Sequence, residues 1–186
     1  MEEKKLTATE SRKIKYLLAT NQKSALRSAG YSASALLSAG YSASALRSAG
    51  YSASDVRSAG YSEEDLKEWD SIPVLEKPYT RLLEGINAKK LVHNQATFGP
   101  EECLDEGNIC GTPMCTAGHL VQSAGKIGWE LRKKYGWSDA ATLIHYKAHP
   151  DYPPQDFGGI PQAWAIAYIE YMADIEANVP QKENAE

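Results

Sequence analysis

The chain has 186 residues, with 20 basic and 24 acidic side chains and a formal net charge of −4. This balance excludes the overall positive field that draws proteins onto nucleic acid or anionic membranes. No apolar run approaches the roughly 20 residues that span a bilayer, and the start of the chain lacks the apolar stretch of a secretory signal. We therefore predict a soluble cytoplasmic protein with no membrane partner.

Residues 1–21 are the first predicted element. They include the stretch Ser11-Arg-Lys-Ile-Lys-Tyr-Leu-Leu18, in which apolar and charged residues are spaced as in an amphipathic helix. Terminal units of a repeat array need a covering element, so we expect this helix to cap the array that follows.

Residues 22–68 repeat with a period of ten. Each unit has one apolar position and one glycine, and the glycine is followed by a tyrosine and a serine. The apolar residues are Leu26, Leu36, Leu46, Val56 and Leu66, the glycines are Gly30, Gly40, Gly50 and Gly60, and the tyrosines are Tyr31, Tyr41, Tyr51 and Tyr61. Repeats this regular are typical of solenoids.

The residues of one unit predict a short helix that is closed at both ends. Serine is a good N-cap, and Ser52 with Asp55, like Ser62 with Asp65, has the spacing of a capping box. The glycine supplies the left-handed position after the helix, and the tyrosine folds back over the apolar side. A strand–turn solenoid is the alternative, but the Ala-Leu-Arg content and the scarcity of β-branched residues favour helix. We expect successive units to stack their Leu and Tyr side chains into a narrow core.

Decapeptide arrays of the Leu-Arg-x-Ala-Gly-Tyr-Ser type resemble tandem repeats of bacterial, phage and giant-virus proteins. The resemblance implies an α-solenoid and no particular activity.

The array also carries a row of basic side chains at one position of the unit. These are Arg27, Arg47, Arg57 and Lys67, with Leu37 interrupting the row. Such a row beside tyrosines would suit a nucleic-acid backbone, a solvated face that keeps an Ala-rich rod soluble, or a docked protein. The nearby acidic residues at 63–65 favour the solvated face over nucleic acid. Protein docking is the functional use that we favour, and its predicted binding residues are Tyr31, Tyr41, Tyr51, Tyr61, Arg27, Arg47 and Arg57.

Beyond the array, Trp69 is expected to seal the last unit, and Pro73 and Pro78 mark a linker over residues 69–77. Residues 78–180 predict a helical domain, followed by a charged tail at 181–186. We expect its helices over 78–91, 116–135, 138–148 and from Pro161 onward, packed as four helices around one core. In the last helix, the expected apolar stripe is Trp164, Tyr168, Ile169, Met172 and Ile175. The predicted class is thus all-α, a short-helix solenoid followed by a small helical bundle.

The most distinctive segment of this domain is Cys110-Gly-Thr-Pro-Met-Cys115-Thr-Ala-Gly-His119. It is preceded by His93-Asn-Gln95 and followed by Ala140-Ala-Thr-Leu143. This combination resembles a widespread, uncharacterised bacterial and phage family that is often found beside repeat arrays. Asn108-Ile109 stand where that family often has an aromatic residue. The resemblance implies no reaction for this chain.

Three interpretations of the segment stay open. Cys103, Cys110, Cys115 and His119 could coordinate zinc, which prefers thiolates and imidazoles, with His93 as a further ligand candidate. Alternatively, Cys115 at a helix N-terminus would have a lowered thiol pKa and act as a nucleophile, with His119 or His145 as its base. The third interpretation is structural, because cysteine is among the most buried residue types. The cysteines could then be free thiols, or Cys110 and Cys115 could form a disulfide.

We therefore expect a non-enzymatic interaction or assembly protein without a cofactor. It would be phage-encoded and part of a larger particle, located in the host cytoplasm or the virion, and the solenoid would dock a partner protein or another copy of the chain. The first alternative is a thiol- or zinc-dependent enzyme centred on Cys115 and His119. The second is a nucleic-acid-binding protein that uses the Arg and Tyr face of the solenoid.

Overall fold

The computed structural model of this chain describes residues 30–38, 41–101, 111–150, 152 and 154–178. The described residues fall into two units, which we treat separately. One comprises the residues up to Pro73 together with His145–Pro154, and the other comprises Val74–Ile144 together with the residues from Gln155 onward. Both are helical, which confirms the predicted all-α class and argues against a strand–turn solenoid.

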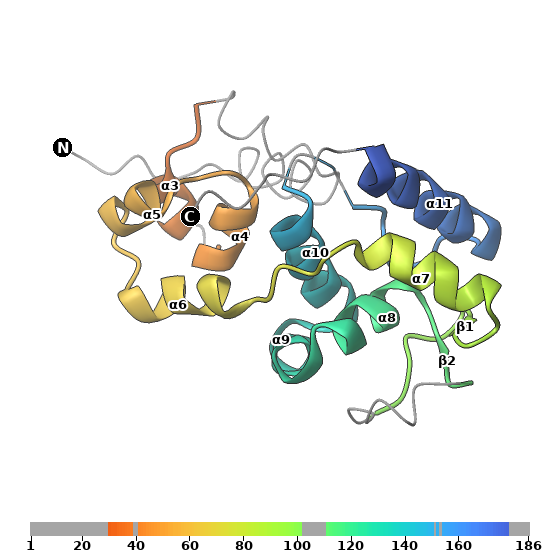
Figure 1. The fold of residues 1–186 in the computed structure, drawn as a ribbon. Helices are drawn as coiled ribbons and strands as arrows, with labels where there is room; N and C mark the ends of the chain where they lie inside the picture. The colour runs from red at the N-terminus through yellow and green to blue at the C-terminus, as the bar shows by residue number, and fades with distance from the viewer. Residues whose placement is uncertain (1–29, 39–40, 102–110, 151, 153, 179–186) are drawn as a thin grey trace. The chain divides into compact units, whose positions relative to one another are not determined.

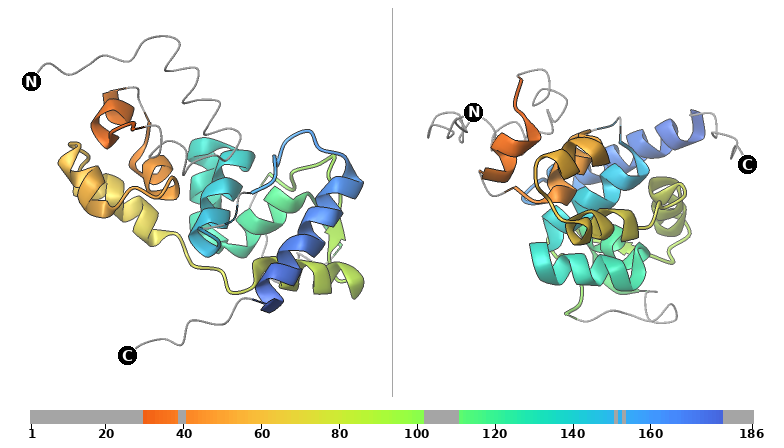
Figure 2. Two further views of the ribbon diagram at one scale, coloured as in Figure 1. Left: turned by 90° about the horizontal axis from the view of Figure 1, so that it is seen from above. Right: turned by 90° about the vertical axis from the view of Figure 1, so that its left-hand side faces the viewer.

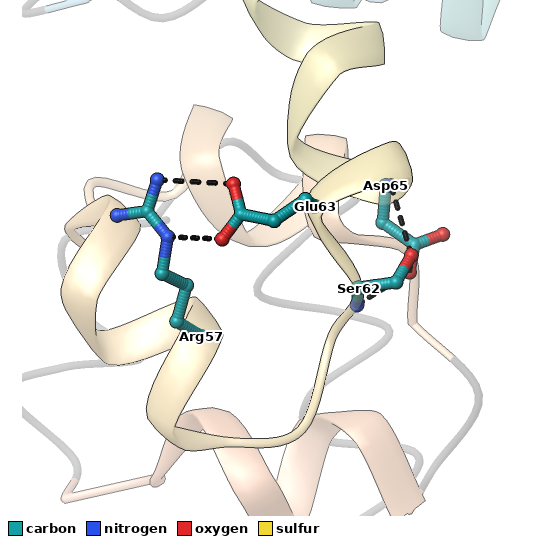
Figure 3. A network of polar contacts seen from close by, with 4 residues as sticks. All are labelled: Arg57, Ser62, Glu63 and Asp65. Carbon is teal, nitrogen blue, oxygen red and sulfur yellow. Dashed lines mark hydrogen bonds and ion pairs between the residues drawn. The ribbon is translucent and has the colours of Figure 1, made fainter.

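Four short helices of the repeat lie in the first unit: α3 (Ala33–Ser38), α4 (Ala43–Ser48), α5 (Ala53–Ser58) and α6 (Glu63–Ser71). Their starts follow the predicted capping chemistry. At α6, the Ser62 hydroxyl accepts the backbone N–H of Asp65 (3.2 Å), and the Asp65 carboxylate accepts that of Ser62 (2.9 Å). Figure 3 shows this capping box, and Ser52 and Asp55 form the same box at α5.

Gly50 and Gly60 end α4 and α5 in the predicted left-handed conformation. Gly50 has a φ of 83°, and its N–H bonds to the carbonyl of Arg47 (3.0 Å). The N–H of Tyr51 then bonds to the carbonyl of Leu46 (3.1 Å), which completes a Schellman motif. Each unit therefore satisfies the backbone groups at its own ends, so a helix of six residues persists within the array.

Helices two units apart pack against each other, α3 on α5 and α4 on α6, in addition to contacts of α4 with α3 and α5. The apolar side chains of the repeat meet in this stack, and all of them are at most 3% exposed: Leu36, Leu46, Val56 and Leu66. We expected stacking of successive units, whereas the array also stacks alternate ones. The reason is the tight glycine turn, which sends consecutive short helices in different directions.

A buried tryptophan lies in the last turn of α6. Trp69 is 7% exposed. Its carbonyl accepts a hydrogen bond from Lys147 Nζ (3.0 Å), and the same ammonium lies 5.0 Å from the centroid of the Trp69 ring. Lys147 belongs to the short segment His145–Pro154 that is part of the same unit.

The second unit contains the helices α7 (Pro78–Asn87), α8 (Thr116–Ser123), α9 (Gly125–Tyr135), most of α10 (Trp137–Ala148) and α11 (Gln162–Asn178). Two short strands, β1 (Val92–His93) and β2 (Pro113–Met114), pair in parallel. Helices α7 and α11 lie side by side and share the closest packing of this unit (Figure 1, Figure 2).

Three local predictions for this unit are wrong. The helix expected over 116–135 is two helices, because the chain bends at Gly125, whose φ of 59° is left-handed. The helix expected over 78–91 ends at Asn87, and Lys89 follows with a φ of 56°. Trp164, expected on the apolar stripe of the last helix, is 69% exposed, while Ala165 on the adjacent side is buried.

Among the described residues, no helix combines the length and the apolar character needed to cross a membrane.

Candidate functional site

The tyrosines of the repeat are largely inside the array. Tyr51 and Tyr61 are 4% and 9% exposed, and Tyr31 and Tyr41 are partly buried. The Tyr51 hydroxyl donates to the carbonyl of Tyr31 (2.7 Å), and the Tyr61 hydroxyl donates to the carbonyl of Tyr41. Burial, aided by the Asp65 carboxylate, raises the pKa of Tyr61 to about 12. These hydroxyl bonds thus connect repeat units that are two units apart in the array. Only the exposed edges of the tyrosine rings are available to a partner.

Two of the predicted basic residues already have partners within the array. The Arg47 guanidinium donates to the carbonyl of Tyr51 (2.8 Å). Arg57 forms a two-point pair with Glu63, at 2.5 Å for Nε–Oε1 and 3.2 Å for Nη2–Oε2, as Figure 3 shows. That carboxylate raises the pKa of Arg57 further above its ordinary value. Arg27 lies outside the described residues.

An open groove of about 370 Å³ lies on the first unit. Tyr31 and Tyr51 line it, together with Asp55 and Ser58 from α5. Two of the four tyrosines predicted to bind a partner therefore border a hollow on the surface, although most of each ring is covered.

Cys115 is a buried free thiol at the start of α8. It is the N-cap of this helix, where its sulfur accepts the backbone N–H of Gly118 (3.5 Å). Burial raises the pKa of this thiol and outweighs the opposing effect of the Gly118 N–H. An activated nucleophile requires the opposite shift.

His119 lies on the first turn of α8 and is 4% exposed. Its Nε2 is 3.2 Å from the carbonyl of Val92 in β1. Burial lowers its pKa to about 4, and the adjacent His93, whose ring stacks at 6.2 Å between centroids, contributes in the same direction. His119 is therefore a neutral imidazole near pH 7 that fastens β1 to α8.

His93 belongs to a polar network that sequence reasoning missed. Its Nδ1 lies 2.8 Å from the amide nitrogen of Gln162, and that nitrogen also donates to the His93 carbonyl (3.2 Å). The Gln162 oxygen accepts the backbone N–H of Gln95 (2.7 Å). With Nδ1 accepting from Gln162, the ring proton resides on Nε2 and points to the Thr116 hydroxyl at 3.0 Å. A donating His93 does not withdraw a proton from Thr116.

No local signal marks Gln162 as the partner of His93, because the two residues are 69 positions apart. Only covariation between the two positions or a structure would reveal the pair.

The zinc hypothesis depends in part on residues outside the described ranges, which are Cys103 and Cys110. Within the described ranges, no group of three or more His, Cys, Asp or Glu side chains is placed to hold a metal ion. Cys115 and His119 share one helix turn, and each has a backbone partner, the N–H of Gly118 for Cys115 and the carbonyl of Val92 in β1 for His119. His145, the other candidate base, is fully buried and its Nε2 lies 2.8 Å from the carbonyl of Tyr152.

Comparison with known protein families identifies residues 5–71 as a decapeptide repeat region. The match begins inside the segment expected to form the N-terminal cap and ends at the last residue of α6. Neither the curated proteins nor the solved structures provide a match to the chain.

Proposed function

We propose that this protein is a non-enzymatic interaction or assembly protein and that the groove on its decapeptide repeat docks a protein partner. The resemblance of the repeats to those of phage proteins makes a multi-copy particle in a host cell the setting that we favour. The observation that carries the proposal is the open groove bordered by Tyr31, Tyr51 and the end of α5.

The pattern of constancy and change along the repeat supports this role. The Leu, Gly, Tyr and N-cap Ser positions recur because each is needed for packing or for a helix end. The fifth helix residue, in contrast, is Leu37, Arg47, Arg57 and then Lys67, and none of these side chains is buried. Surface positions that vary on a constant scaffold are the usual binding positions of solenoid proteins.

The surroundings of Cys115 and His119 support a structural role for residues 115–119, which we call the Cys-to-His segment. The thiol pKa is raised, and the imidazole is neutral and bound to a strand carbonyl. This segment fixes β1 against α8, which leaves the repeat as the surface for binding.

The test replaces Ser58, an exposed residue that lines the groove, by arginine. Arginine at the last helical position is compatible with the helix dipole, so α5 should persist while the groove is filled. Ser54→Arg on the same helix is the matched control, because Ser54 is exposed and does not line the groove. Both variants and the wild type are compared by quantitative affinity purification and by sedimentation velocity.

We expect a partner, or a self-associated species, that is present with the wild type and Ser54→Arg and lost with Ser58→Arg. An identical set of partners and an identical sedimentation profile for all three proteins would refute groove docking. Nucleic acid retained with a steep salt dependence, and lost when Arg47 and Arg57 become glutamine, would instead support the nucleic-acid alternative.

A further inference from the structure

A second cavity lies in the second unit, between α7 and α8. The docking function proposed above does not involve it. It encloses about 300 Å³, the lower end of the range for small-molecule sites. Three leucines supply apolar walls: Leu75 before α7, Leu82 on α7 and Leu91 before β1. Leu82 is buried and the other two are half-buried, so the cavity can cover a short hydrocarbon chain.

The polar groups along the walls are held in fixed positions before any ligand enters. His119 is fixed by the Val92 carbonyl. The Gln122 side-chain oxygen accepts the indole N–H of Trp129 (3.1 Å), which orients this amide. A preformed wall lowers the ordering cost that a small ligand would otherwise meet.

Two charged residues line the cavity, Arg81 and Glu76. Their side chains form an ion pair, with 2.8 Å between Arg81 Nη2 and Glu76 Oε2. Their side chains are 66% and 67% exposed, and pairs this exposed contribute little to stability. A carboxylate on an incoming ligand has the same chemistry as Glu76 and can replace it on Arg81 at little cost. The planar guanidinium fork suits such a carboxylate.

The N-terminus of α7 does not provide a competing anion site. Its first-turn N–H groups at Tyr79 and Thr80 donate to the two carboxylate oxygens of Glu176, at 3.1 and 2.7 Å. Arg81 is the cationic residue among those that line the cavity.

We propose that the cavity binds a small aliphatic monocarboxylic acid, with its chain between Leu75, Leu82 and Leu91 and its carboxylate on Arg81. The site is in a different unit from the docking groove, so neither proposal depends on the other.

Titration of the full-length protein with hexanoate, followed by ¹H–¹⁵N NMR, tests the assignment. We expect saturable shifts in the amides of α7 and α8 with a Kd on the order of 1 mM, typical of so small a ligand. Hexylamine and hexanol are the charge-reversed and neutral probes, and both should bind at least about tenfold more weakly.

Two lining variants are expected to act in opposite directions. Arg81→Gln should weaken hexanoate binding about tenfold, because it removes the cation. Glu76→Gln should tighten binding, because it removes the carboxylate that competes for Arg81. Lys126→Gln breaks an exposed Lys–Glu pair of α9 that does not line the cavity, and it is the matched control. Both lining residues are exposed, so the dispersion of each variant's NMR spectrum verifies its fold.

Three outcomes would overturn the proposal. The first is the absence of saturable shifts at concentrations well above 1 mM. The second is equal binding of hexanoate and hexylamine. The third is unchanged hexanoate binding by Arg81→Gln, which would mean that the cavity takes up hydrocarbon without reading the carboxylate.

Discussion

At the scale of single residues, burial decides the chemistry of the Cys-to-His segment. The sequence places Cys115 at a helix start, where a thiol pKa is usually lowered, yet burial raises it. Histidine often acts as a general base, but the pKa of His119 is about 4 and its ring bonds to the Val92 carbonyl. It is therefore a neutral structural group near pH 7. These two residues therefore stabilise the unit as uncharged side chains.

The lowered pKa of His119 predicts a loss of stability in acid. Its pKa is about 4 in the folded protein against an ordinary 6.5, so its contribution is complete above pH 6.5 and is lost as the pH falls toward 4. Between pH 7 and 4.5 we expect the wild type to lose about 2 kcal/mol more than His119→Gln. Urea unfolding at both pH values measures this, with His149→Gln as the control. Parallel losses in wild type and His119→Gln would contradict the assignment.

At the scale of elements, the repeat obtains its stability from bonds that recur along the chain. The units of α4 and α5 close their own helix ends, and the hydroxyls of Tyr51 and Tyr61 each donate to a carbonyl twenty residues earlier in the chain. Gly118 shows the contrasting case in α8, where packing against another segment decides the residue. A Cβ at this position would be only 1.8 Å from the Phe98 carbonyl oxygen.

Removing a tyrosine hydroxyl should destabilise the repeat only where the hydroxyl has a partner. Tyr61→Phe loses the bond to the Tyr41 carbonyl and should cost about 1 kcal/mol. The hydroxyl of Tyr41 itself is buried without a partner among the described residues, so Tyr41→Phe should be neutral or slightly stabilising. Chemical unfolding followed by far-UV circular dichroism compares the two, and an equal cost for both variants would contradict the hydrogen-bond assignment.

Adding one methyl group at Gly118 should strongly destabilise the second unit. Gly118→Ala drives a Cβ into the Phe98 carbonyl, and overpacking against backbone costs about 3 kcal/mol or more. The control is Gly158→Ala, where the nearest atom is the Ser138 hydroxyl at 3.6 Å, so we expect little change. Thermal unfolding of both variants decides the point. A tolerated Gly118→Ala would mean that Phe98 does not pack on α8 as described.

At the scale of the whole molecule, the second unit is closed by contacts between segments that are distant in sequence. Glu176, near the end of α11, is 5% exposed and accepts the N–H groups of Tyr79 and Thr80 at the start of α7. The N-cap residue of α7, Lys77, makes no side-chain capping bond. The cap of this helix thus comes from a residue almost a hundred positions away.

Replacing this distant cap should destabilise the second unit. Glu176→Ala leaves the buried N–H of Tyr79 and the part-buried N–H of Thr80 without their acceptor and should cost about 3 kcal/mol. Glu170→Ala on the exposed side of the same helix is the control, with an expected change below about 0.5 kcal/mol. Hydrogen exchange of the amides in α7 reports the effect directly. Unchanged protection in Glu176→Ala would exclude the capping role.

The repeat could be predicted from residue types alone, including the capping boxes, the left-handed glycines and the buried Leu position. These features could be predicted because each depends on interactions within about ten residues. In the second unit the sequence also indicated the helical class. It did not predict the bend at Gly125 or the His93–Gln162 pair.

The environments of Cys115 and His119, in contrast, depend on how distant segments pack together. A pKa depends on desolvation and on hydrogen-bond partners, and one partner of His119, the Val92 carbonyl, lies in β1, 27 residues away. The same holds for the cavity beside α7, whose walls come from three separate stretches of chain. The pattern of residue types fixes local geometry, but burial and charge are properties of segments brought together by folding.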